Sequence, residues 1–381
     1  MNCPVRPLLA LILSSLIPGL LHAQTPFRTD DGDAKLPWYQ IQPGVFPPEG
    51  SAHYFSGELI RVDHLERQFV LRVDRTDAQN RSHWDLPVFI TMLPYGSIHY
   101  HGAPAALEDI PLGTHLHGQF YAKDPLDKTK PLEGWHNRIS FEGGFNRCLR
   151  LEDDFSYHQR QNQLWRIEEV NEAEKKLTAT LLRESKPVDQ PKTFDLIDST
   201  RVWLGRSVAS VKELTKGQTV QLNLTWATLY GPGRIREIWA DDESRALATT
   251  HQLEKHHLHT RNRGLAGWID AVDNQKRLVT ITFFDIVDPK LFDPLQPNTS
   301  AAVAVAKHNL LTYDPVNDRQ GGTIQKVTKV PLEPGNSGLQ IQIQTNLLLE
   351  GFRPHRFVRL YPSGWSVLAL PKEEELFGRE D

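Results

Sequence analysis

The chain has 381 residues, with 43 basic and 47 acidic side chains and a formal net charge of −4 at pH 7. A general binder of nucleic acid or of an anionic membrane surface would carry a strong positive footprint, so this balance argues against both classes of protein. The two cysteines, Cys3 and Cys148, leave no intrachain disulfide if the first residues are removed, so stability must come from packed apolar cores.

The first residues have the pattern of an export signal. Arg6 precedes the apolar stretch PLLALILSSLIPGLL, and Ala23 offers a small residue at a cleavage point. The stretch is short for a transmembrane helix, and a Pro-Gly pair interrupts it. We therefore predict a signal peptide at residues 1–23, a periplasmic or secreted mature protein and no stable membrane insertion. An uncleaved N-terminal anchor is the alternative. Residues 24–50 are rich in Pro and Gly and predict an extended N-terminal segment.

Three stretches of the chain share one pattern without a gap. They are GELIRVDHLERQFVLRV from Gly57, WRIEEVNEAEKKLTATL from Trp165 and GWIDAVDNQKRLVTITF from Gly267. Each predicts a β-hairpin in which an apolar strand ends at a valine, Asp or Asn opens the turn, and a second strand alternates with period two. The aligned turn residues and bases are Asp63, Asn171 and Asp273, followed by Arg67, Lys175 and Arg277. The predicted inward residues of the second strands are Phe69, Leu71, Val73, Leu177, Ala179, Leu181, Val279, Ile281 and Phe283.

The spacing of these hairpins, about 105 residues, suits a small domain. We predict β-barrel units at 51–150, 164–238 and 264–372, helical linkers at 151–163 and 239–263, and a C-terminal tail at 373–381. Aspartate pairs at 153–154 and 241–242 predict the helix N-caps, and Gly264 predicts a C-cap. In the third unit, KHNLLTYD is the predicted middle strand and EGFRPHRFVRLY the closing strand. An insertion rich in turn residues separates the two.

The motifs G-x-I-x-x-V-D and L-x-x-G-x-x-V, with the alternating second strand, resemble the OB-like small barrels that occur as tandem repeats in exported bacterial proteins of unknown function. The resemblance implies a mainly β fold of three tandem small OB-like β-barrels joined by short helical linkers. It implies a fold and not an activity.

Two H-x-H pairs in the first unit, His99/His101 and His115/His117, are the candidate metal ligands. Residues two apart on a strand project to one face, so two adjacent strands could place these imidazoles around a Zn²⁺, Cu²⁺ or Ni²⁺ ion. The alternative is that the rings are ordinary residues on the wet face of a barrel strand.

We favour the wet-face interpretation. In the repeat, Thr219 and Gln221 occupy the positions of His115 and His117, and the other units carry no H-x-H there. We therefore expect separate, partly exposed rings, with Ile98 and Leu116 packed inward. A second histidine run, HQLEKHHLH from His251, has the composition of a solvated helix face, and metal binding through it is a further alternative.

Motifs for a serine nucleophile, a zinc protease, a phosphate loop or a C-x-x-C pair are absent from the sequence. The tryptophans either fill cores and contacts between units or bind a glycan. We predict an exported, non-catalytic binding or scaffold protein with no cofactor, whose partner is an unknown envelope or extracellular protein. One alternative is a metal-binding protein that uses the histidine pairs with zinc or copper. The other is an enzyme, for example a carbohydrate-active one, with its site between units.

Overall fold

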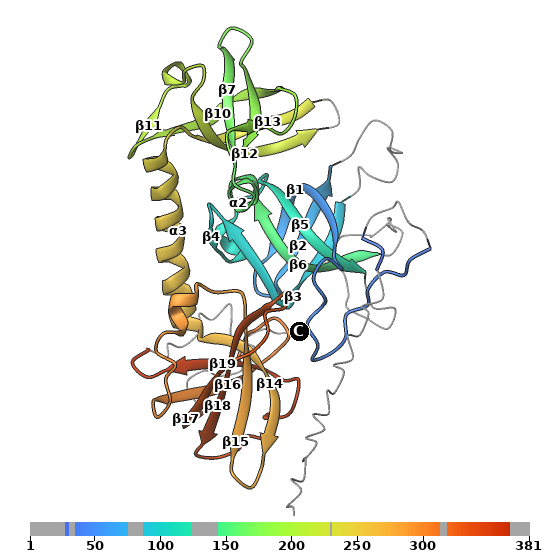
Figure 1. Cartoon of the computed structure of the whole chain (residues 1–381), viewed down its shortest axis with the longest axis vertical. Helices are drawn as coiled ribbons and strands as arrows, with labels where there is room; N and C mark the ends of the chain where they lie inside the picture. The colour runs from blue at the N-terminus through green and yellow to red at the C-terminus, as the bar shows by residue number, and fades with distance from the viewer. Residues whose placement is uncertain are drawn as a thin grey trace, which may run out of the picture.

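The computed structural model describes residues 27–29, 35–74, 87–122, 144–228, 231–312 and 318–365. The predicted signal peptide, residues 1–23, and the predicted tail, residues 373–381, lie outside this part of the chain. The described part forms three closed β-barrels in tandem, with five, five and six strands and only two α-helices (Figure 1). The prediction of a mainly β fold of three small barrels joined by helices is confirmed.

The first barrel closes in the order β1-β2-β3-β6-β5, with β5 pairing back to β1. Its strands are β1 (His53–Asp63), β2 (Gln68–Val73), β3 (Pro87–Tyr100), β5 (His115–Ala122) and β6 (Phe145–Asp153). The short β4 (Ala103–Pro104) pairs with the end of β3. Strands β3 and β6 run parallel, and all other pairs are antiparallel. Closure leaves the main strands without an open edge.

The second barrel repeats this strand order and the single parallel pair, here between β10 and β13. Its strands are β7 (Gln163–Asn171), β8 (Lys176–Arg183), β10 (Lys192–Leu204), β12 (Thr219–Thr228) and β13 (Gly231–Trp239), with the short β9 (Lys186–Pro187) and β11 (Ser207–Ala209) at its edges. The first two units of the repeat therefore fold with one topology.

The third barrel is antiparallel throughout and closes in the order β14-β15-β18-β17-β16-β19. Its strands are β14 (Leu265–Asp273), β15 (Leu278–Phe284), β16 (Ser300–Ala306), β17 (Arg319–Lys329), β18 (Asn336–Thr345) and β19 (Phe357–Pro362). The predicted insertion supplies β17 and β18, which are part of the barrel wall. The predicted middle strand KHNLLTYD is wrong over its described part, residues 307–312: β16 ends before it, and a turn follows in which Leu310 donates its N–H to Lys307 and has φ +67°.

The three repeated hairpins agree in detail. Each has a bulge two strand positions before its valine, and each Asp or Asn accepts a hydrogen bond from the backbone N–H three residues on. The left-handed residue is the base four positions after the Asp or Asn, with φ of 52°, 52° and 53° at Arg67, Lys175 and Arg277. All nine predicted inward residues of the second strands are buried. The predicted phase of these strands is confirmed.

Both α-helices begin at the predicted aspartates. Helix α2 (Asp154–Arg160) has Asp153 as its N-cap, and helix α3 (Asp242–Arg263) begins after Asp241; each cap accepts an N–H from the helix's first turn. Gly264, with φ +78°, ends α3. Three 3₁₀ turns complete the helical elements: η1 (Leu107–Asp109), η2 (Val211–Glu213) and η3 (Pro289–Phe292). Among the described residues, no helix is both long enough and apolar enough to cross a membrane.

Helix α3 runs along the molecule and touches all three barrels (Figure 1). It contacts β4 of the first barrel, β10 and β13 of the second, and β19 of the third. An apolar group that we name the junction cluster also joins the first and third barrels. It consists of Phe46, Leu93, Tyr95, Tyr121, Leu149, Ala266, Trp268, Phe284 and Leu310. The barrels are therefore packed against one another as well as linked in sequence.

Candidate metal centre

His115 and His117 lie on the outer face of β5, on either side of Leu116, whose side chain is in the core of the first barrel. Helix α2 and strand β12 of the second barrel cover this outer face. The two histidines are consequently only 4% and 9% exposed. The expectation of separate, partly exposed rings on a wet face is wrong for this pair, because the neighbouring barrel excludes the solvent. The inward packing of Ile98 and Leu116 is confirmed.

Asp154, the first residue of α2, brings the two rings together. Its Oδ1 lies 2.7 Å from His115 Nδ1 and 3.0 Å from His117 Nε2. One ligating atom from each of these three buried side chains lies within 4.8 Å of the other two. Two imidazoles and a carboxylate at this separation are a donor set that suits a divalent transition metal ion. We name these three residues the His-His-Asp cluster.

Outside the cluster, other groups hold the remaining polar atoms of its members. His115 Nε2 lies 2.6 Å from Asp74 Oδ2, and His117 Nδ1 lies 2.7 Å from the Tyr54 hydroxyl. The second oxygen of Asp154 accepts the N–H of Leu224, at 2.9 Å, and the ring of Tyr157 stacks on His117 with centroids 3.7 Å apart. The second barrel thus supplies one of the contacts that orient the cluster.

Burial and charge act in opposite directions on these groups. Burial favours a neutral imidazole, but the carboxylates of Asp154 and Asp74 outweigh it and raise the pKa of His115 well above its usual value. Burial alone would raise the pKa of Asp154, but the two histidines lower it below its usual range. The site therefore favours a positive charge between two carboxylates, and either a proton or a metal ion can supply that charge.

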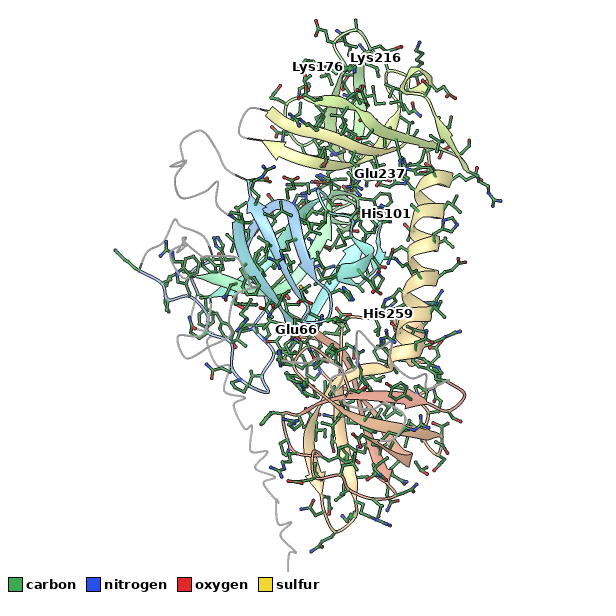
Figure 2. All side chains as sticks on the ribbon, turned by 180° about the vertical axis from the view of Figure 1, so that it is seen from behind. Glu66, His101, Lys176, Lys216, Glu237 and His259 are labelled. Atoms are coloured by element: carbon green, nitrogen blue, oxygen red, sulfur yellow. The ribbon has the colours of Figure 1, made fainter. Side chains whose placement is uncertain are left out.

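His99 and His101 have other surroundings. Burial, followed by the charge of Arg150, lowers the pKa of His99 to about 4, and its Nδ1 has no hydrogen-bond partner among the described residues. His101 faces Glu237, 3.6 Å away, between the first two barrels (Figure 2), and its ring stacks on Tyr100. The structure therefore brings together two of the four predicted ligands, and it adds Asp154.

Asp154 was missed as a ligand because the sequence presents it as half of a helix-capping pair. Asp153 does the capping, so its neighbour is free for another role. The signal that could have identified Asp154 is the redundancy of the pair. One aspartate suffices to cap a helix, so the second carboxylate needs either solvent or another partner. The contact of Asp154 with the histidines of β5 depends on how the linker folds back onto the first barrel. No local sequence pattern predicts that.

Three rings of the second histidine run contact residues of the neighbouring barrels. His256 is buried and accepts the N–H of Asp288, at 3.2 Å. His257 lies 2.5 Å from a carboxylate oxygen of Asp288, and His259 lies 3.2 Å from Glu108. These contacts attach α3 to the neighbouring barrels.

The tryptophans whose side chains are buried fill cores and contacts between units. Trp165 belongs to the core of the second barrel, Trp268 to the junction cluster, and Trp239 packs on His101 between barrels. For these three rings the packing interpretation is confirmed. Trp84 and Trp135, which the glycan hypothesis also included, lie outside the described residues.

Comparison with known proteins gives no match to a family model, to a curated protein or to a solved structure.

Proposed function

We propose that this protein is an exported binding protein that holds one transition metal ion, zinc or copper, at the junction of its first two barrels. The ligands are His115 Nδ1, His117 Nε2 and Asp154 Oδ1. The observation that carries the proposal is that one ligating atom from each of these three buried side chains lies within 4.8 Å of the other two. Imidazole nitrogen and carboxylate oxygen are ligands that both ions accept.

The contacts around the cluster support this proposal. A histidine that binds a metal usually gives its other ring nitrogen to a carboxylate or another polar group, which fixes the tautomer and the orientation of the ring. Here the outer atoms of all three side chains have such a contact, with Asp74, Tyr54 and the Leu224 amide. The ligands are therefore held in place before an ion arrives, which limits the entropy cost of binding it.

Charge also favours a divalent ion. Asp154 and Asp74 place two carboxylates on either side of one imidazole in a site from which water is largely excluded. A dication bound to Asp154 and to two neutral imidazoles would balance both negative charges. The competing interpretation is a purely structural ion pair, in which a protonated His115 joins the two carboxylates.

Metal stoichiometry separates the two interpretations. The chain without its first 23 residues and without a histidine tag is loaded with zinc or copper, desalted and analysed for metal. We expect about one ion per chain. His117→Gln should lose the ion, whereas His99→Gln should keep it, since His99 lies outside the cluster. A wild-type stoichiometry near zero after loading with either metal would establish the ion pair and overturn the proposal.

Tyr54→Phe tests the site without removing a ligand. The side chain is 46% exposed, so the fold should tolerate the loss of one hydroxyl. Removing the hydroxyl contact with His117 should weaken metal binding by about 10–100-fold, as expected for an outer contact of a metal ligand. An affinity equal to that of the wild type would show that Tyr54 does not orient the bound ring.

A scaffold role is the second candidate, and the packing of the barrels favours it. Helix α3 and the junction cluster tie the three units together, so that their outer faces keep fixed positions relative to an envelope or extracellular partner. The shared strand order of the first two barrels, with its one parallel pair, also supports their assignment as OB-like. Small-angle X-ray scattering should give the profile of one rigid body. A profile that requires freely moving barrels would contradict this role.

A further inference from the structure

A pocket of 350 Å³ lies between the first and third barrels. Strands β3, β5 and β6 of the first barrel line it, together with Arg160 at the end of α2. The third barrel contributes Asp285, which follows β15, and residues 332–335 of the turn between β17 and β18. Residues 48–50, which precede β1, complete the lining. This volume is within the range of pockets that bind small organic molecules. We name it the interbarrel pocket.

The wall that the third barrel supplies is acidic. Asp285 and Glu333 belong to it, and Glu49 adds a carboxylate from the segment before β1. In the part of the chain that the structure describes, none of these three side chains makes a hydrogen bond or an ion pair. Burial raises the pKa of Asp285, and the charge of Arg150 opposes this effect. Asp285 is therefore within the electrostatic range of Arg150 but is not bonded to it.

The wall that the first barrel supplies carries hydrogen-bond donors. Arg150 of β6 and Arg160 of α2 share the carboxylate of Glu152. Arg150 uses only its Nε–H for this contact, at 2.9 Å. The two terminal nitrogens of its guanidinium group have no acceptor among the described residues. Gln119 of β5 is the strand partner of Arg150, and its amide also makes no hydrogen bond within the described residues. This wall can therefore donate to a bound carboxylate while the pair with Glu152 stays intact.

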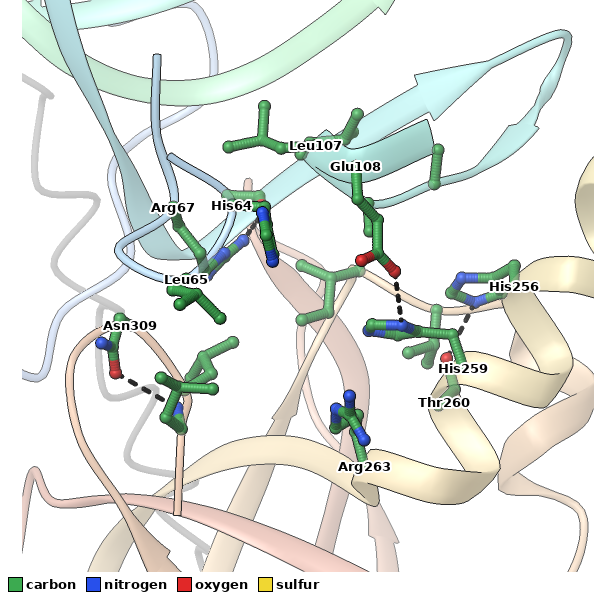
Figure 3. A pocket seen from close by; sticks show the side chains of 18 of the residues that line it. His64, Leu65, Arg67, Leu107, Glu108, His256, His259, Thr260, Arg263 and Asn309 are labelled. Atoms are coloured by element: carbon green, nitrogen blue, oxygen red, sulfur yellow. Dashed lines mark hydrogen bonds and ion pairs between the residues drawn. The ribbon is translucent and has the colours of Figure 1, made fainter. Parts of the chain in front are cut away.

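Elsewhere in the molecule, opposite charges that face each other between units are joined. In a cavity of 110 Å³ between the first barrel, α3 and the third barrel, Glu108 Oε1 lies 3.2 Å from His259 Nδ1 (Figure 3). Lys255 of α3 pairs with Asp109 of the first barrel in the same way. No such ion pair crosses the interbarrel pocket between its described lining residues. An open space therefore separates charges of opposite sign on its two walls.

We propose that the interbarrel pocket binds a small zwitterion of the amino-acid class, a free amino acid or a dipeptide. Its carboxylate accepts hydrogen bonds from the terminal nitrogens of Arg150, and its ammonium group donates to Asp285 and Glu333. A guanidinium fork matches the two oxygens of a carboxylate, and such charged hydrogen bonds are stronger than neutral ones. Leu332, which is 78% exposed, offers an apolar contact to an aliphatic side chain. The described lining includes no member of the His-His-Asp cluster, so this site does not depend on the proposed metal centre.

The test is isothermal titration of the full mature chain with alanine and with alanylalanine, which distinguishes the two sizes of ligand. We expect saturable binding of at least one of them, at one molecule per chain. Two analogues of each probe lack one charge: N-acetylation removes the ammonium group, and amidation removes the carboxylate. Each analogue should bind at least about tenfold more weakly, because it loses one charged contact. Absence of saturable binding of both zwitterions up to about 10 mM, or equal binding of either analogue, would overturn the proposal.

Asp285→Asn is the decisive variant, and Asp293→Asn is its matched control, at an exposed carboxylate of the third barrel outside the pocket lining. The first should weaken binding by about tenfold or more, and the second should leave it unchanged. In Asp285→Asn, N-acetylation of the probe should cause little further loss, because the contact that it removes is already missing. If Asp285→Asn does not fold, Glu333→Gln changes the same wall in an exposed turn and should also weaken binding. Wild-type affinity in the folded variant would remove this pocket as the binding site.

Discussion

Tertiary contacts bury polar side chains of this molecule, those of the His-His-Asp cluster among them. His115 and His117 alternate with Leu116, as expected for a strand with one face in the core and one face in solvent. Both histidines are nevertheless buried. The equivalent of His117 in the second barrel, Gln221, is buried as well. Helix α2 contacts both β5 and β12, so it covers the outer faces of two barrels at once. Helix α2 and strand β12 together therefore create the buried site in which two rings and one carboxylate meet.

His256 should make the protein sensitive to acid. Burial, followed by the charges of His259 and His257, lowers its pKa to about 4, against opposing effects of Asp288 and Asp109. Because the unfolded chain takes up this proton near pH 6.5 and the folded chain does not, stability is full above pH 6.5 and falls as the pH drops towards 4. The loss from this residue is about 3 kcal/mol at most.

The measurement is the free energy of unfolding by urea at pH 7, 5.5 and 4.5. His256→Gln keeps an acceptor for the Asp288 N–H but cannot titrate, so its stability should fall less steeply between pH 6.5 and 4. His251→Gln, which changes an exposed ring on the same helix, should follow the wild type. A variant at His256 with the wild-type pH dependence would show that this ring does not carry the effect.

At the scale of elements, the hairpins are where side-chain alternation decides the structure. Ile281 of β15 points into the third barrel, and Thr280 points out of it. Ile281→Asp should unfold this barrel, since an unpaired buried carboxylate costs several kcal/mol, about 4 or more. Thr280→Asp introduces the same charge one position earlier and should cost far less. Circular dichroism during thermal unfolding of the two variants makes the comparison; equal melting temperatures would contradict the strand phase.

The hairpins, their inward residues and the helix caps could be predicted because each depends on residues close together in sequence. The wall of the third barrel could not, since β15 pairs with β18 across an insertion and only the pairing shows that the insertion is part of the barrel. The candidate metal site could likewise be predicted only in part. The H-x-H spacing placed His115 and His117 on one face of a strand, but Asp154 reaches them from the following linker through a tertiary contact.

At the scale of the whole molecule, α3 and the junction cluster make three barrels into one body. Trp268 of the third barrel packs on Phe46, with ring centroids 4.1 Å apart, and on Tyr95 of the first barrel. The indole is buried among residues from several separate stretches of the chain. Contacts of this kind couple the unfolding of the units that they join.

Trp268→Ala should uncouple the first and third barrels. Loss of the buried ring should cost about 3–5 kcal/mol. We expect calorimetry to show two separated transitions where the wild type shows the barrels melting together. Leu258→Ala, at an exposed position on α3, should leave the wild-type trace. A single transition in the Trp268 variant would mean that α3 alone is enough to couple the barrels.

The most direct test of the central claim is a crystal structure of the zinc-loaded mature chain, with anomalous diffraction collected at the zinc edge. We expect one strong peak between the first two barrels, about 2.0–2.2 Å from His115 Nδ1, His117 Nε2 and Asp154 Oδ1. A map without a peak at these atoms, with Asp154 still hydrogen-bonded to both rings, would show an ion pair in place of a metal centre.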